Sequence, residues 1–391
     1  SKNVGSYAIT VGGLYSSQQG YDLISAGTAS ITAATLTVSG ATAANKTYDG
    51  TISATVSGGS LSGLVGGDTV ALSQSGSFSD KNAGTGKTVT ETFAISGSDA
   101  GNYVLASSSG TTTANITAAT LTVTGTSAAS KTYDGTTSAT VSGGALSGVI
   151  SGDTVALGQS GTFSDKNAAT GKTVSYTSGL SGTDSGNYVL ASSSGTTTAD
   201  ITAATLTVSG STAANKTYDG TTAATVSGGS LSGLVGGDTV TLSQSGSFSD
   251  KNAGIGKTVT ETFAISGSDA GNYVLASSSG TTTANITAAT LTVSGTTASN
   301  KTYDGTTSAT VSGGALSGVI SGDTVVLGQS GSFSDKNVGT GKTVSTTSSL
   351  SGTDAGNYVL ASSSGSTTAD ITAATLTVSG ATAANKTYDG T

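Results

Sequence analysis

An 85-residue repeat is the feature that most constrains this chain. The hexapeptide KTYDGT recurs five times, and its tyrosine stands at Tyr48, Tyr133, Tyr218, Tyr303 and Tyr388. GDTV and NYVLASSSG recur at the same interval, without an insertion or deletion. The period exceeds the 20–50 residues of solenoid repeats and suits a domain near the lower size limit of independent folding. The sequence therefore predicts a tandem array of small domains.

The segment ITAATLTV joins the end of each repeat to the start of the next. The four complete repeats predicted from it are 35–119, 120–204, 205–289 and 290–374. Residues 1–34 are interpreted as the C-terminal part of a divergent preceding repeat, and residues 375–391 as the start of a fifth. Because Ser1 opens within the pattern, we expect the sequence to be a piece of a longer chain.

A second periodicity pairs the repeats. The first and third repeats differ at five aligned positions, whereas the first and second differ at twenty. We call the first and third the A repeats and the second and fourth the B repeats, so their order along the chain is A-B-A-B. Phe93 and Phe263 in the A repeats are replaced by Ser178 and Ser348 in the B repeats. Position 93 shares the alternation of Val89, which predicts that it faces the core.

Apolar and polar residues alternate within each repeat, as at Leu36 and Val38, and Gly-rich turns separate the runs. This period of two, with many β-branched residues, predicts seven to nine short strands and an all-β domain, sandwich-like or β-grasp-like. Only Ala-Ala-Thr lies between the strand expected near Ile116 and the one opening at Leu121. So short a connection restricts bending. We therefore expect an extended, semi-rigid rod, roughly 150 Å long at ~3.3 Å per residue of strand.

The composition argues against catalysis and several partners. The chain has no His and no Cys, so the common general base and the thiol nucleophile are both missing. We expect no enzyme activity, no catalytic residues and no cofactor. Lys residues are scattered and the net charge is −8, which argues against a nucleic-acid partner. No apolar run approaches the ~20 residues of a membrane span, so we expect no membrane insertion.

Recurring aspartates are the candidate metal ligands. Asp49, Asp68, Asp80 and Asp99 return in every repeat, mostly beside Gly or Asn, and Ca²⁺ takes oxygen ligands from such loops. Neither an EF-hand loop nor a nine-residue Gly-Asp repeat is present. Asp-Gly and Asp-Ala-Gly-Asn are also ordinary turn sequences, in which the side chain bonds its own backbone. The sequence favours turns and predicts no metal site.

Other residues offer alternatives to a purely structural role. Tyr48 is either a surface residue that stacks on sugars or a ring packed inside with its hydroxyl at the edge, and packing is favoured. Thr111–Thr113 resembles an ice-binding array, but the short regular repeat of such proteins is absent. A Lys–Asn isopeptide bond is disfavoured because its catalytic Glu would not be shared by the B repeats. The residues that this bond would involve are Lys46, Lys81, Lys87, Asn82 and Glu91, the last replaced by Tyr176 and Thr346.

Together these motifs resemble a known repeat family. KTYDGT, GDTV, FSDKN-x-GTGK, SGSDAGNYVL and ITAA at fixed spacing are similar to the YDG and MBG-type repeats of bacterial surface proteins. In the flank, Asn3–Tyr7 followed by Ala8–Val11 resembles the second half of an MBG-type unit.

The resemblance implies a large secreted adhesin similar to filamentous haemagglutinin, often exported by two-partner secretion. It implies an extracellular protein of the bacterial cell surface or biofilm matrix, with this segment as a stalk that projects a binding domain. The alternative is a self-associating or polysaccharide-binding matrix protein. In that alternative the repeats bind each other or polysaccharide directly. For the protein as a whole, the expected partners are exopolysaccharide, a host surface or a second copy, bound through regions mostly outside this segment.

Overall fold

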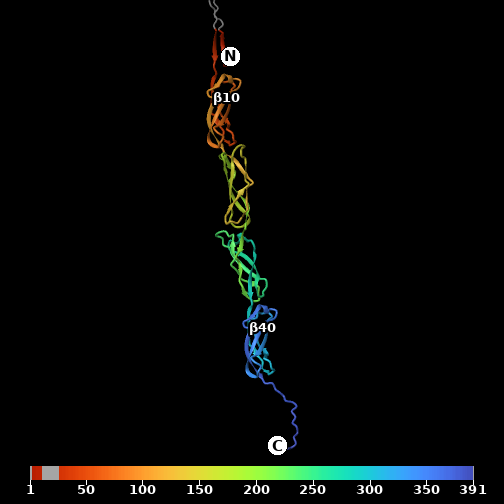
Figure 1. The fold of residues 1–391 in the computed structure, drawn as a ribbon. Coiled ribbons are helices and arrows are strands. Elements are labelled where there is room, and N and C mark those ends of the chain that lie inside the picture. The colour runs from red at the N-terminus through yellow and green to blue at the C-terminus, as the bar shows by residue number, and fades with distance from the viewer. Residues whose placement is uncertain (1, 11–25, 391) are drawn as a thin grey trace, which may run out of the picture. The chain divides into compact units, whose positions relative to one another are not determined.

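The computed structural model describes residues 2–10 and 26–390 (Figure 1). Two compact units divide the chain, residues 1–202 and 203–391, and each is described by itself. Each unit holds two of the 85-residue repeats. Val11, which the sequence assigned to the preceding repeat, lies outside the described residues.

Repeat 1 consists of ten strands and one 3-10 turn, Ala100–Asn102. The strands are β3 (Ala34–Ser39), β4 (Thr42–Ala43), β5 (Lys46–Thr47), β6 (Ser53–Ala54), β7 (Val56–Ser57), β8 (Ser60–Ser62), β9 (Ala71–Phe78), β10 (Gly84–Ser96), β11 (Tyr103–Leu105) and β12 (Ser109–Thr117). Seven to nine strands were expected, and the number is higher because β4 to β7 are separate two-residue strands.

The strands of repeat 1 form two main sheets. A five-stranded sheet has the order β5-β12-β10-β9-β6, and a three-stranded sheet has the order β11-β3-β8. β4 and β7 add a two-stranded ladder. The pairs β3–β11 and β5–β12 are parallel, whereas the long β10 pairs antiparallel with both β9 and β12. The first strand of the repeat therefore depends on a partner about 70 residues later in the chain.

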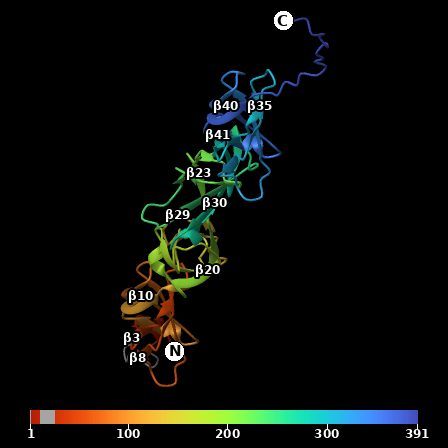
Figure 2. The ribbon, with the colours of Figure 1, turned by 90° about the horizontal axis from the view of Figure 1, so that it is seen from below.

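The remaining repeats reproduce these strands with bounds shifted by 85, 170 and 255 residues. Repeat 2 runs from β13 (Ala119–Thr124) to β22 (Ser194–Thr202), repeat 3 from β23 (Ala204–Ser209) to β32 (Ser279–Thr287), and repeat 4 from β33 (Ala289–Ser294) to β42 (Ser364–Thr372). Figure 2 shows β29 (Thr241–Phe248) beside β30 (Gly254–Ser266) in repeat 3. The described part of the chain contains no α-helix. The all-β prediction is confirmed, with four β-rich repeats in tandem.

The flanks differ from the repeats. At the N-terminal flank, β1 (Gly5–Thr10) pairs antiparallel with β2 (Ala26–Ile31), as β10 pairs with β12. Residues 374–390 form no strand, and the side chains of Leu376, Val378 and Tyr388 are exposed. This follows from the topology, because a first strand such as β3 needs β8 and β11 of its own repeat as partners.

The core of each repeat lies against the five-stranded sheet. In repeat 1 it includes Val56, Phe78, Val89 and Ile116, all nearly inaccessible to solvent. Phe93 is also buried, which confirms that position 93 faces inward. In repeat 2 the equivalent Ser178 is buried as well and accepts a hydrogen bond from Gln159 Nε2 at 3.2 Å. Repeats 1 and 2 thus fill the same position with an apolar ring and with a polar pair, respectively.

A glycine on β9 gives the first testable prediction. A Cβ on Gly76 would lie 2.6 Å from Val56 Cγ2 and 3.0 Å from Val89 Cγ1, inside the packed core. We expect Gly76→Ala to destabilise repeat 1 by about 1–3 kcal/mol through overpacking.

Hydrogen exchange read by mass spectrometry can follow the opening of β10, whose peptide carries Thr85 in repeat 1 and Ile255 in repeat 3. Gly66→Ala is the control, because a Cβ there meets nothing within 4 Å. Equal exchange of the repeat 1 β10 peptide in Gly76→Ala and Gly66→Ala would contradict the prediction.

Candidate functional site

The contact between repeats 1 and 2, both in the first unit, brings the recurring motifs together. β12 ends at Thr117 and β13 begins at Ala119, so a single residue separates the strands of adjacent repeats. The predicted short connection is confirmed. It places KTYDGT and SDKN of repeat 1 against GDTV and the D-x-GNY segment of repeat 2. We call this contact the junction.

Asp153 of GDTV is the centre of the junction. Its side chain is only 2% exposed and belongs to repeat 2. Lys81 Nζ of repeat 1 lies 2.8 Å from Oδ1. The hydroxyls of Tyr48 from repeat 1 and Tyr188 from repeat 2 both donate to Oδ2, at 2.7 and 2.6 Å. One carboxylate therefore accepts three hydrogen bonds, two of them from the neighbouring repeat.

The two tyrosines also pack on each other. Their rings meet edge to face with centroids 5.3 Å apart, a favourable geometry for aromatic pairs. Lys81 Nζ lies 5.9 Å from the centroid of Tyr48, within range of a cation–π interaction. The Tyr188 hydroxyl in turn accepts a hydrogen bond from the Ile150 backbone N–H at 3.0 Å. The Tyr188 hydroxyl thus holds the loop of repeat 2 that carries Ile150 and Asp153, and the Tyr48 hydroxyl ties that loop to repeat 1.

Backbone contacts complete the junction. Asn187 Oδ1 of repeat 2 accepts a hydrogen bond from the Ala83 N–H at 2.8 Å, and its Nδ2 donates to Asn82 Oδ1 at 3.2 Å. Gly50, the glycine of KTYDGT, has a φ of +76°, which favours Gly. A Cβ there would lie 3.1 Å from Ile150 Cγ2, so a side chain would also crowd the next repeat.

A shared apolar cluster lies behind these polar contacts. Buried residues of repeat 1 such as Tyr48, Phe78 and Ile116 pack in one cluster with Leu121 and Tyr188 of repeat 2. Partly buried side chains of repeat 2 extend the cluster, namely Leu146, Val149, Ile150, Val155, Leu180 and Leu190. The hydrophobic core therefore continues through the junction.

The second unit repeats this arrangement between repeats 3 and 4. Tyr218 and Tyr358 donate to Asp323 Oδ2 at 2.7 and 2.6 Å, and Lys251 Nζ lies 3.0 Å from Oδ1. Repeat 4 itself provides an internal comparison. Its Tyr303 is 37% exposed, against 3% for Tyr48 and Tyr218. The burial of this tyrosine therefore requires the GDTV loop of a following repeat.

The N-terminal flank makes part of the same contact with repeat 1. Lys2 Nζ lies 3.1 Å from Asp68 Oδ1, and the Tyr103 hydroxyl donates to Asp68 Oδ2 at 2.8 Å. The Val4 N–H donates to Asn102 Oδ1 at 2.8 Å, as Ala83 does to Asn187. Residues 2–4 therefore bond the loops of repeat 1 in the way that Lys81 and Ala83 bond those of repeat 2.

The junction shifts the pKa values of its members. The hydrogen bonds from Lys81, Tyr188 and Tyr48 lower the pKa of Asp153 to about 2. Asp153 in turn raises the pKa of Lys81 above its usual range. Burial, and then the hydrogen bond to Asp153, raise the pKa of Tyr188 to about 12. The junction is therefore most stable with Asp153 and Lys81 charged and both tyrosines neutral.

The other recurring aspartates occupy turns and loop contacts. Asp49 Oδ1 accepts the Thr51 N–H at 2.9 Å, and Asp80 Oδ1 accepts the Asn82 N–H at 2.8 Å, as the turn prediction required. Asp99 differs, because its Oδ2 accepts the Thr69 N–H of another loop. Asp153 and Asp323, which are equivalent to Asp68, also differ, because each accepts a hydrogen bond from a tyrosine of the preceding repeat. Within residues 2–10 and 26–390, no group of three acidic side chains is placed to hold a metal ion.

The lysines weighed for an isopeptide bond lie in separate ion pairs. Lys46 pairs with Asp49 and Lys87 with Asp80, whereas Lys81 pairs with Asp153 across the junction. Glu91 is 5% exposed on β10, and no lysine pairs with it in the described part of the chain. The predicted packing of Tyr48 is confirmed, although its hydroxyl bonds the next repeat. Thr111 and Thr113 lie exposed on β12, opposite Thr90 and Thr88.

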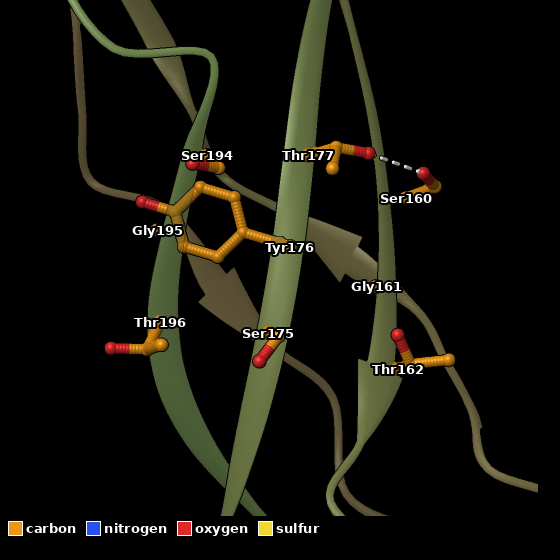
Figure 3. Close-up of a pocket in the computed structure, with 9 residues that line it drawn as sticks. All are labelled: Ser160, Gly161, Thr162, Ser175, Tyr176, Thr177, Ser194, Gly195 and Thr196. Atoms are coloured by element: carbon orange, nitrogen blue, oxygen red, sulfur yellow. Dashed lines mark hydrogen bonds between the residues drawn. The ribbon is translucent and has the colours of Figure 1, made fainter.

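A groove lies along β20 (Ala169–Ser181) in repeat 2, at the position of Glu91 (Figure 3). Tyr176 replaces Glu91 and faces Gly161 and Gly195 on the neighbouring strands. Ser160 and Thr177 form a hydrogen bond of 3.0 Å beside it. Figure 3 shows the Tyr176 ring lying toward Gly195, where a side chain would collide with it.

The residues of the junction were not predicted as a site. Asp153 and Lys81 were each weighed, but as a turn residue and as an isopeptide candidate. One signal was available, because KTYDGT, GDTV and SDKN are identical in all four repeats. Residues that meet across a junction need an invariant spacing, and Tyr48 and Asp153 are 105 residues apart, one period plus twenty.

Helix-free domains of about 85 residues, joined by a shared core and one connecting residue, define a tandem-repeat β protein. The YDG domain model matches residues 32–113, 117–198, 202–283 and 287–367. The chain therefore belongs to the YDG domain family, as its motifs predicted, and Tyr48-Asp49-Gly50 provides the letters of the name. No curated protein matches the chain.

Two solved structures resemble parts of the chain weakly. Three N-terminal domains of the highly immunogenic outer capsid protein of bacteriophage RB49 are 12% identical, cover 78% of this chain and 99% of their own, and have a TM-score of 0.20. Drosophila N-cadherin EC1-4 is 8% identical, covers 85% of this chain and 98% of its own, and also has a TM-score of 0.20. Among the described residues, no helix is long and apolar enough to span a membrane.

Removing one hydroxyl tests the junction. We expect Tyr48→Phe to weaken the coupling of repeats 1 and 2 by about 1–3 kcal/mol, because its hydrogen bond reaches a charged acceptor in a buried site. Tyr303→Phe is the matched control. It changes the same KTYDGT position where no following repeat covers the ring, and we expect it to stay within about 0.5 kcal/mol. Denaturant unfolding of the full chain measures both, and equal losses would contradict a linking role.

The junction should also depend on pH. Since the pKa of Asp153 is about 2 in the folded chain against 3.8 normally, its contribution is complete above about pH 4 and is lost as pH falls toward 2. The raised pKa of Tyr188 acts at the alkaline end of the pH range. Its contribution to stability is complete below about pH 10 and is lost as pH rises through about 12. The difference in unfolding free energy between the native chain and Asp153→Asn should therefore be largest between about pH 4 and pH 10 and should fall outside this range. A gap independent of pH would contradict the assignment.

Proposed function

We propose that this chain is a structural stalk segment of an extracellular bacterial adhesin, which projects a binding domain from the cell surface. The junction is the observation that carries the proposal. In each unit, a single residue connects the two repeats, and a buried carboxylate bonds side chains of both. A connection of this kind resists bending, whereas a flexible linker would allow the repeats to fold back.

The repetition supports the same function. Four near-copies of one domain increase length without adding a distinct surface, and the charge of −8 is spread evenly along the chain. Such even charge keeps an extended protein soluble and weakly self-repelling. The chemistry of the residues supports a non-enzymatic role, because the chain lacks both His and Cys. We place the protein outside the cell, at the bacterial surface, as the family resemblance implies.

Self-association into a biofilm matrix is the second candidate. Equal spacing of similar faces would allow many weak contacts to act together. A groove lined by Glu91 in repeat 1 favours a binding role for that repeat. Neither candidate requires catalysis.

Displaying the chain between a membrane anchor and a tip binding domain tests the stalk. Removing residues 35–204, one A-B pair, shortens the chain by two repeats and keeps the period. We expect cells with the shorter chain to capture a tip ligand less well through a grafted polymer layer, because the tip no longer clears it. Cells that display the four repeats without a tip domain should stay dispersed.

Two outcomes would count against the stalk. Capture that is unaffected by the deletion would show that length is not the function. Clumping of cells that lack the tip domain would favour the self-associating alternative. Tip variants that cannot bind the ligand serve as the control for adhesion by the repeats themselves.

A further inference from the structure

A polar groove of about 320 Å³ lies beside β3 in repeat 1. Glu91 and Phe93 of β10 form part of its lining, and residues 37–41, 106–107 and 109–111 form the rest. Ser and Thr hydroxyls, such as those of Ser39 and Ser107, lie around it. The volume falls at the lower end of the range of small-molecule sites in proteins.

Glu91 is an unusual member of this lining. Its side chain is 5% exposed, and its Oε1 has no hydrogen-bond donor among the described residues. Gly76 and Gly110 flank it on the adjacent strands, and a Cβ on Gly110 would lie 2.7 Å from Glu91 Oε2. The two glycines therefore leave room for the carboxylate. Oε1 itself is closed to solvent, so a ligand can reach the carboxylate only from its groove side. A buried charge is costly, and a cation that approaches the carboxylate from the groove lowers this cost by neutralising it.

The other repeats provide an internal series. In repeat 3, Ser211 donates to Glu261 Oε2 at 3.0 Å, so one oxygen of this carboxylate has a hydrogen-bond donor within the chain. In repeat 1 the equivalent residue is Ala41, which lines the groove and has no hydroxyl. In repeat 4 a groove of about 380 Å³ recurs, with Thr346 in place of the glutamate. Repeat 1 thus combines the groove with the least satisfied carboxylate.

We propose that the groove of repeat 1 binds an amino-sugar unit of a polysaccharide, with its ammonium on Glu91. An ammonium both neutralises a carboxylate and donates to it, and such charge-assisted bonds are the stronger ones. Sugar hydroxyls suit the Ser and Thr side chains of the lining. A divalent metal ion is disfavoured because the lining of the groove includes no second acidic side chain. The repeat then holds polysaccharide weakly in addition to acting as a spacer.

Titration calorimetry of the full chain tests the site. The probe is a tetramer of β-linked glucosamine, and its fully N-acetylated counterpart lacks the ammonium. We expect the glucosamine tetramer to bind with a dissociation constant of about a millimolar or below, and the acetylated one at least about tenfold more weakly. We expect Glu91→Gln to weaken binding of the glucosamine tetramer by about tenfold or more, and Glu261→Gln to weaken it less.

Asp200→Asn is the matched control for net charge. It removes one negative charge outside the groove and restores the residue that repeats 1 and 3 carry as Asn115 and Asn285. We expect it to leave binding within about twofold. Should Glu91→Gln fail to fold, Ala41→Ser gives an independent test. It adds the hydroxyl of repeat 3, which would compete with the ligand, and should also weaken binding.

Three results would overturn the proposal. The first is no detectable binding of the glucosamine tetramer. The second is equal loss in Glu91→Gln and Asp200→Asn, which would mean that the negatively charged chain attracts a polycation without a site. The third is equal affinity for the acetylated tetramer, which would remove the role of the ammonium. None of these results bears on whether the chain acts as a stalk.

Discussion

A carboxylate shared between two repeats is the interaction on which the rest of this structure depends. Asp153 lies in repeat 2, but two of its three donors, Lys81 and Tyr48, belong to repeat 1. A repeat by itself would leave this carboxylate with only one of the three donors, Tyr188, and would leave Tyr48 without its acceptor. Repeat 4 illustrates this state, because Tyr303 is 37% exposed where no following repeat covers it. The small core of each domain is supplemented by its neighbour, as is usual in repeat proteins.

The polar and apolar parts of the junction have different roles. The cluster that joins Phe78 and Ile116 to Leu121 buries apolar surface and is not directional. The hydrogen bonds of Asp153 require one relative orientation, because each donor must point at a particular oxygen. Asn187, bonded to the Ala83 backbone, adds a second fixed point. Together these contacts hold two domains in one arrangement, although only one residue connects them.

Most of the fold could be predicted from the sequence. The alternation at Leu36, Val38, Val89 and Phe93 gave strand positions and an inward face that the structure confirms, because in a strand the side-chain period alone decides which face is buried. Strand pairing could not be predicted in this way. The parallel pairing of β3 with β11 joins residues about 70 positions apart, and no local pattern encodes such a partner.

The junction was less accessible to prediction for the same reason. Asp153, Lys81 and Tyr48 each have an ordinary local interpretation, as a turn residue, a surface charge and a packed ring. Only the contact between domains gives them a common role, and it involves residues 105 positions apart. Glu91 was noted because it varies between A and B repeats, but its burial without a donor depends on Gly76 and Gly110 of neighbouring strands.

The placement of the junction residues has a consequence for how such chains change in length. Every complete repeat carries the Tyr and Lys of one side and the Asp and Tyr of the other, at a constant offset. Recombination between copies can add or remove a whole number of 85-residue units. The C-terminal side of one repeat then meets the N-terminal side of another, as it did before. The new boundary has the same complementary residues as the one it replaced, and no compensating substitution is needed. A gene of this kind can vary the reach of its product in single genetic events.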